Sequence, residues 1–196
     1  MADVKISDLS GATTPLTGAE LMELSQDNGG TLDSVQATAE QVAYANPKIG
    51  SFYDTTDQTG NIAAATPVTF NTNAVNTLGV TVASSSRVTF AAAGLYSVQF
   101  SLEFANSDAA DHNVNVWLAK NGTAIATSNS ITTVSKLGDG GRLHFANDDL
   151  IQLAANDYLE VMWLPLDATV TIDYKSAGAI APATPSATFT AERLSL

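Results

Sequence analysis

AAAGLYSVQFSLEF, residues 91–104, decides the fold, because apolar and polar side chains alternate along it. Alternation with a period of two is typical of a β-strand with one buried face and one exposed face. The apolar side chains are all large, which predicts a central strand of an antiparallel sheet, with these side chains in the core or in a subunit interface. These positions are Tyr96, Val98, Phe100, Leu102 and Phe104.

Other short runs rich in β-branched and aromatic residues follow in the same half of the chain. We expect strands within residues 66–70, 78–82, 86–90, 114–126, 150–164, 168–174 and 187–196. Asn121-Gly122 suits the type I′ turn of a hairpin, and residues 154–157 suit a turn between two strands. Because no long helical periodicity interrupts these strands, the sequence predicts a mainly β, antiparallel sandwich or jelly roll.

Composition excludes several classes of protein. The chain has 196 residues, of which 45% are hydrophobic and 14% charged, which favours a folded domain with a core. Its net charge of −12 argues against a nucleic-acid partner, since little could neutralise a row of phosphates. No apolar run approaches the ~18 residues of a membrane span, and the N-terminus lacks the pattern of a secretory signal. The absence of cysteine excludes disulfides and thiolate sites.

The composition changes near Pro47. Residues 1–48 contain 7 acidic and 2 basic residues and no Phe or Trp, whereas all 7 Phe and both Trp follow residue 50. We therefore expect an N-terminal arm, residues 1–48, and a main domain, residues 49–196, that contains the hydrophobic core.

The arm has its own local signals. Residues 20–26 and 31–36 flank Asp-Asn-Gly-Gly and predict a β-hairpin. Thr38 and Gln41 have the spacing of a capping box, and Pro47 closes the segment, so a short helix should follow. With so few large apolar side chains, this unit is expected to become ordered by packing on something else.

No catalytic constellation stands out. His112 and His144 could act as acid–base groups, but no Ser or paired acid has a recognisable spacing to either. Carboxylates that could bind Ca²⁺ are more typical of solvated turns, because no Asp-x-Asp-x-Asp-Gly loop is present. We therefore expect no catalytic site, no cofactor and no metal, with Asp54, Asp57, Asp139, Asp148 and Asp149 as the acids considered.

The two tryptophans belong to the core or to a subunit interface. Trp117 breaks the alternation of Val114, Val116 and Leu118 and should point to the opposite face. Trp163 is flanked by Met162 and Leu164, and we expect its side chain to lie in the hydrophobic core. Because Trp117 and Met162 lie off the faces assigned to the core, a monomer would expose a large apolar patch, which favours a homotrimer.

The main domain also carries a family resemblance. TPVTFNTN, VTFAAAGLYSVQFSLEF, VNVWLAKNG, LAANDYLEVMW and ATFTAERLSL occur in this order between Ser51 and Leu196. This set resembles the trimeric jelly-roll domain of tumour necrosis factor and the complement globular head. The closing strand departs from the Phe-Ser-Gly-Phe pattern of that family, since it reads Phe189-Thr190-Ala191-Glu192.

The arm resembles the N-terminal attachment segments of phage virion and tail-fibre proteins. The similar stretch is KISDLSGATTPLTGAELMELSQDNGGTLDSVQATAEQVA. Those segments read Ile-Ser-x-Leu, then Leu-Thr-Gly-x-Glu-Leu, then Gly, and then Val-(Thr)-x-x-Gln-(Leu/Val). Residues 181–194 are similar to the C-termini of phage proteins with this β domain. Together these resemblances imply a homotrimer on the virion surface, assembled in the host cytoplasm. The implied docking residues are Ile6, Leu9, Leu16, Leu21, Leu24 and Val35.

Two functional classes stay open. The first is a capsid decoration (cement) protein, whose arm docks on the major capsid protein or another virion protein and stabilises the head. The second is a short tail-fibre tip that recognises a host glycan or protein. Length favours the first, because a fibre needs a long shaft and the linker here is about five residues.

Overall fold

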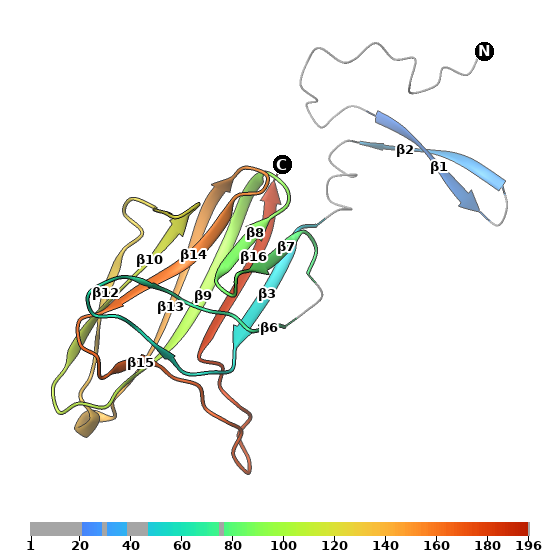
Figure 1. Ribbon diagram of the computed structural model, residues 1–196. Helices are drawn as coiled ribbons and strands as arrows, with labels where there is room; N and C mark the ends of the chain where they lie inside the picture. The colour runs from blue at the N-terminus through green and yellow to red at the C-terminus, as the bar shows by residue number, and fades with distance from the viewer. Residues whose placement is uncertain (1–20, 29–30, 39–46, 75–76, 196) are drawn as a thin grey trace. The chain divides into compact units, whose positions relative to one another are not determined.

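The computed structural model in Figure 1 describes residues 21–28, 31–38, 47–74 and 77–195. The chain divides into two compact units, Met1–Pro47 and Lys48–Leu196. Within the described residues, no helix has the length and apolar character needed to cross a bilayer.

The first unit contains one β-hairpin. β1 (Leu21–Asn28) pairs antiparallel with β2 (Thr31–Thr38), from Leu21 opposite Thr38 to Asn28 opposite Thr31. The hairpin lies where the Asp-Asn-Gly-Gly signal predicts it. Thr38 is the last residue of β2, and the helix expected after it, residues 39–46, lies outside the described residues.

The second unit is a sandwich of two antiparallel sheets. The first sheet has the order β4–β15–β9–β16–β3–β6, and β13 pairs with the other edge of β9. Its strands are β3 (Ile49–Asp54), β4 (Gln58–Thr59), β6 (Thr72–Asn73), β9 (Gly94–Asn106), β13 (Arg142–Leu153), β15 (Val170–Ile172) and β16 (Ala187–Ser195).

The second sheet packs against the first. Its order is β11–β10–β14–β8–β7, with β12 beside β10 and β5 beside β14. Its strands are β5 (Thr66–Pro67), β7 (Val80–Ala83), β8 (Arg87–Phe90), β10 (His112–Lys120), β11 (Thr123–Ala124), β12 (Ser130–Val134) and β14 (Tyr158–Pro165). A 3-10 turn, η2 (Leu137–Asp139), follows β12. The antiparallel β-sandwich expected from the sequence is confirmed.

β9 is the strand that the opening stretch predicts, and it is central. It pairs with β13 along one edge and with β16 along the other. The side chains from Tyr96 to Phe104 that face the second sheet are at most 3% exposed. Burying each side chain of this size contributes roughly 1.5–3 kcal/mol, so β9 alone anchors much of the core.

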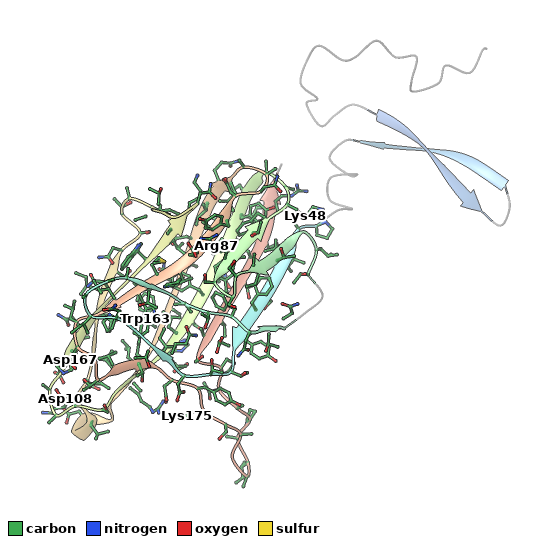
Figure 2. The ribbon with its side chains drawn as sticks, in the orientation of Figure 1. Lys48, Arg87, Asp108, Trp163, Asp167 and Lys175 are labelled. Carbon is green, nitrogen blue, oxygen red and sulfur yellow. The ribbon has the colours of Figure 1, made fainter. Side chains whose placement is uncertain are left out.

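Trp163 on β14 lies at the centre of the core (Figure 2). It is fully buried, and its ring centroid lies 5.9 Å from that of Phe104 on β9. The segment after β4 approaches it closely at Gly60, where a Cβ atom would lie 2.8 Å from the Trp163 ring and 2.7 Å from Pro165. Only a residue without a side chain fits there.

Several strand expectations differ from the structure, and β3 begins inside the stretch expected to be a linker. The run 66–70 is a strand only over Thr66–Pro67, although Val68 and Phe70 are buried. β12 was not expected at all, and β13 begins at Arg142 rather than near residue 150. The inward face of β13 mixes Phe145 with Asn147 and Asp149, so its pattern lacks apolar alternation.

The sandwich has two distinct ends (Figure 1). At the terminal end, Glu192 pairs with Ile49, and the N–H of Arg193 donates to the carbonyl of Lys48. β9 runs from this end to the distal end. The distal end consists of the loops 107–111, 135–141, 166–169 and 173–186.

Candidate interaction surfaces

Most of the side chains proposed for a core or an interface belong to the core. The β9 positions and Trp163 face the opposite sheet and are essentially inaccessible. They are Tyr96, Val98, Phe100, Leu102, Phe104 and Trp163. None of them is available to contact another chain.

Trp117 and Met162 have a different place, on the outward face of the second sheet. They are directly opposite each other on β10 and β14, and both are partly exposed. Leu164 and Ile131 flank Asn115 one row further along the same face, and Ile131 is 66% exposed. We call Trp117, Ile131, Met162 and Leu164 the outward apolar patch. Sequence reasoning missed Ile131 because β12 gave no apolar alternation.

The outward face of the first sheet carries many polar side chains, although Leu150 on β13 is 66% exposed there. Hydroxyl pairs cross its strands, with the Ser51 and Thr190 oxygens 3.1 Å apart and those of Ser101 and Thr188 2.7 Å apart. An open groove of about 470 Å³ crosses the same face. Its lining is Gln99, Phe100, Ser101, Ala146, Asn147, Asp148, Thr188 and Thr190. This face can form hydrogen bonds over a wide area.

The residues implied for docking all precede the sandwich. Ile6, Leu9 and Leu16 lie outside the described residues. Leu24 pairs with Val35 across the hairpin, and Leu21 pairs with Thr38.

Three of the acids considered as metal ligands, Asp54, Asp57 and Asp139, have structural partners. Buried Asp54 accepts hydrogen bonds from the Thr56 N–H and from the side chains of Thr69 and Asn71. Asp57 accepts one from the Tyr174 N–H, and the Asp139 carboxylate lies 3.5 Å from the Lys136 ammonium. In the part of the chain that the structure describes, no three His, Asp or Glu side chains are grouped to hold a metal ion.

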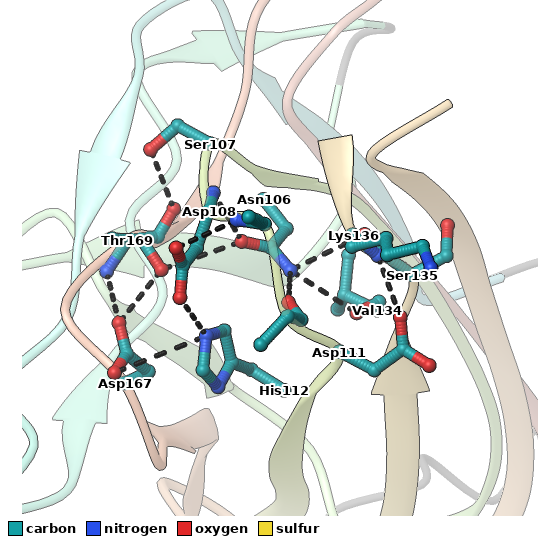
Figure 3. A network of polar contacts seen from close by, with 12 residues as sticks. Asn106, Ser107, Asp108, Asp111, His112, Val134, Ser135, Lys136, Asp167 and Thr169 are labelled. Atoms are coloured by element: carbon teal, nitrogen blue, oxygen red, sulfur yellow. Dashed lines mark hydrogen bonds and ion pairs between the residues drawn. The ribbon is translucent and has the colours of Figure 1, made fainter. Parts of the chain in front are cut away.

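A polar network joins the loops of the distal end (Figure 3). Asn106, the last residue of β9, is 2% exposed, and its amide donates to the carbonyls of Ala110, Val134 and Ser135. Its side-chain oxygen accepts from the N–H of Asp108 and from the Thr169 hydroxyl. One buried amide therefore satisfies backbone groups from separate loops, as buried polar groups require.

Each histidine lies beside a carboxylate. His112 Nε2 is 2.8 Å from Asp108 Oδ2 and 3.9 Å from Asp167 Oδ2 in the distal network. His144 Nδ1 is 2.6 Å from Glu103 Oε1 on the outward face of the first sheet, where both side chains meet solvent. Neither has a nucleophile arranged beside it in the contacts described.

No protein-family model matches the chain, and no curated protein matches it in sequence. Its structure is similar to a crystal structure of murine APRIL at pH 8.0, with 11% identity and a TM-score of 0.51, covering 76% of this chain and 99% of that chain. The globular domain of the zebrafish complement 1qA protein is also similar, with 12% identity and a TM-score of 0.49, covering 75% of this chain and 97% of that chain. The fold is therefore similar to the β-sandwich of murine APRIL. It agrees with the antiparallel jelly roll expected from the sequence.

Proposed function

We propose that this protein is a non-enzymatic structural component of a phage virion, a homotrimer that decorates and reinforces the head. The resemblance of the arm to phage attachment segments supports the virion role. The first and last strands of the jelly roll meet at one end of the sandwich, and this observation supports the proposal most directly. The chain enters the jelly roll at Lys48 beside the last strand, where the Arg193 nitrogen lies 2.9 Å from the Lys48 carbonyl oxygen. All three arms of a trimer then leave from one end.

Self-association accounts for apolar side chains that the core does not use. The outward apolar patch places a tryptophan, a methionine, a leucine and an isoleucine on one face of a chain with a net charge of −12. Contiguous exposed apolar patches mark contact sites in soluble proteins. A homotrimer supplies a partner for such surfaces.

Three linked arms explain how weak contacts can hold the trimer on a capsid. Once one arm is bound, the other two bind at a high effective concentration, so each contact need only be modest. A protein that binds the assembled shell and not its separate subunits stabilises the shell by mass action. The proposed partner is therefore the major capsid protein or a neighbouring virion protein.

The test is the behaviour of particles that lack the protein. They should lose DNA at a lower temperature or in weaker osmotic shock than complete particles, and should attach to host cells at the normal rate. Adding back the purified protein should restore heat stability. Depleted particles that are equally heat-stable but attach poorly would contradict the decoration role.

One observation favours a tail-fibre or receptor-binding tip as the second candidate. The distal loops, far from Lys48, expose Leu137, Leu166 and Ile180, and Ile180 is 101% exposed. Ile180 lies in a stretch without charge, residues 176–191. Such side chains suit contact with a host protein or glycan, and an adsorption defect in the depleted particles would support this role.

A further inference from the structure

His112 links two loops of the distal end. It is the first residue of β10, and its side chain is 18% exposed. Its Nε2 atom faces Asp108, in the loop after β9, at 2.8 Å and Asp167, in the loop after β14, at 3.9 Å. Figure 3 shows both carboxylates directed at the same nitrogen of the ring.

Both carboxylates are oriented for this arrangement by their own loops. Asp108 Oδ1 accepts from the N–H of Ala109, and Asp167 Oδ1 accepts from the N–H and the hydroxyl of Thr169. The second oxygen of each carboxylate, Oδ2, is then left to face the same imidazole nitrogen.

We propose that His112 is a protonation-dependent tie between the loops 107–111 and 166–169, which tightens their contact when it is charged and loosens it when it is neutral. A charged imidazole attracts both carboxylates. A neutral imidazole can donate one hydrogen bond from Nε2 and leaves the other carboxylate facing a like charge.

The surroundings restrict the effect to these loops. The remaining charged groups nearby are engaged elsewhere: Asp111 accepts from the backbone N–H of Lys136, and the Lys136 ammonium pairs with Asp139. Asn106 is uncharged and joins the same loops at every pH. Loss of the charge on His112 therefore loosens the loops without unfolding the jelly roll.

Hydrogen bonds favour the ionised form of both aspartates. The hydrogen bond from His112, with that from the Ala109 N–H, holds the pKa of Asp108 below its ordinary value. Hydrogen bonds from Thr169 do the same for the pKa of Asp167. Between pH 5 and 8, the interval in which histidine ordinarily changes charge, the chain has only one other histidine and no cysteine.

Amide hydrogen exchange on the full-length protein tests the tie. His112→Gln and the wild-type protein are compared at pH 5.5 and again at pH 8, so that intrinsic exchange rates cancel at each pH. At pH 5.5 the variant should lose about tenfold in protection over 107–111 and 166–169, the scale of a charge-assisted hydrogen bond. At pH 8 the two proteins should exchange alike. An equal loss at both pH values, or none at pH 5.5, would overturn the proposal.

Two further variants complete the experiment. His144→Gln removes the exposed partner of Glu103 and should leave both loops unchanged at both pH values. Asp167→Asn keeps His112 and removes one of its two carboxylates, so the pH dependence of loop protection should shrink. If Asp167→Asn keeps the full wild-type pH dependence, the two-carboxylate tie is wrong. All of these readouts use the isolated protein, so they do not depend on its place in a virion.

Discussion

At the scale of single residues, the environment of a side chain decides its role. Asp149 lies opposite Val98 on the inward face of β13, whereas its neighbour Asp148 lines the polar outward groove. Burial, with the negative charge of Asp148, raises the pKa of Asp149 above its ordinary value. The same residue type is thus costly on one face of a strand and well solvated on the other.

We expect Asp149→Asn to stabilise the protein at pH 7. A raised pKa means that the folded state disfavours the ionised carboxylate, so the cost is present above the folded pKa and disappears as the pH falls below it. The melting temperature should rise by about 1–2 °C at pH 7 and the gain should vanish near pH 3. Asp148→Asn is the matched control and should give a smaller gain. A lower melting temperature for Asp149→Asn at pH 7 would show that the carboxylate is needed there.

Gly60 is a second residue whose environment allows little change. Gly60→Ala would place a Cβ atom against the rings of Pro165 and Trp163, neither of which can move aside easily. Overpacking of this kind costs roughly 1–3 kcal/mol, which chemical denaturation would measure. Gly138→Ala, with nothing within 4 Å of the new methyl group, should be close to neutral. Equal stabilities for the two variants would refute the close approach.

At the scale of elements, two turns at the terminal end are tied by one side chain. Asn121 adopts φ 52° in the turn between β10 and β11, as the Asn-Gly signal predicts. Its side-chain amide donates to Asp157, in the turn between β13 and β14, and its side-chain oxygen accepts from the Tyr158 N–H. A turn residue that looks local in sequence thereby joins two hairpins.

Asn121→Gly should keep the turn but lose the tie, because glycine adopts the same backbone conformation and cannot make either hydrogen bond. We expect a loss of about 1 kcal/mol at pH 7. The pKa of Asp157 is lowered, chiefly by the hydrogen bond from Asn121, so this contribution is lost as the pH falls through the folded pKa of Asp157. The difference in melting temperature between the two proteins should therefore shrink in acid, and the part due to the Tyr158 hydrogen bond should remain. A difference in melting temperature that stays constant down to pH 2 would show that the Asp157 carboxylate does not contribute.

At the scale of the whole molecule, the two units differ in what they can bury. The core of the second unit runs from Phe52 to Ala191, entirely within one jelly roll. Its two outward faces differ, since hydroxyl pairs cross the strands of the first sheet and the second sheet carries the outward apolar patch. Formation of the trimer and attachment to the virion can therefore be tested separately.

Light scattering on the full-length protein should give three times the chain mass of 20.3 kDa. The reason is the apolar surface that a single jelly roll leaves exposed. A homogeneous 20.3 kDa species at micromolar concentration would eliminate the homotrimer.

A truncated chain lacking residues 1–46 should keep its β circular dichroism and melt cooperatively, because it retains the whole core. It should fail to bind particles that lack the protein, whereas the full chain binds them. Loss of folding on truncation would mean that the arm is part of the jelly roll, and retained binding would mean that docking uses the sandwich.

The sequence by itself determined the features that depend on local pattern. The period of two in residues 96–104, the Asn-Gly turn at 121–122 and the concentration of aromatic residues after residue 50 sufficed for an antiparallel sandwich with β9 at its centre. Side chains alternate strictly along a strand, so a strand buried on one face reveals itself without knowledge of its neighbours.

Only the tertiary structure decided which segments meet. β12 and most of β13 were missed because the pairing with β10 and β9, rather than apolar alternation, makes them strands. Ile131 joins Trp117 and Met162 through that pairing, and His112 meets Asp108 and Asp167 because three chain segments end at one edge of the sandwich. Contacts between residues distant in the chain depend on strand order and register, which no local stretch of sequence contains.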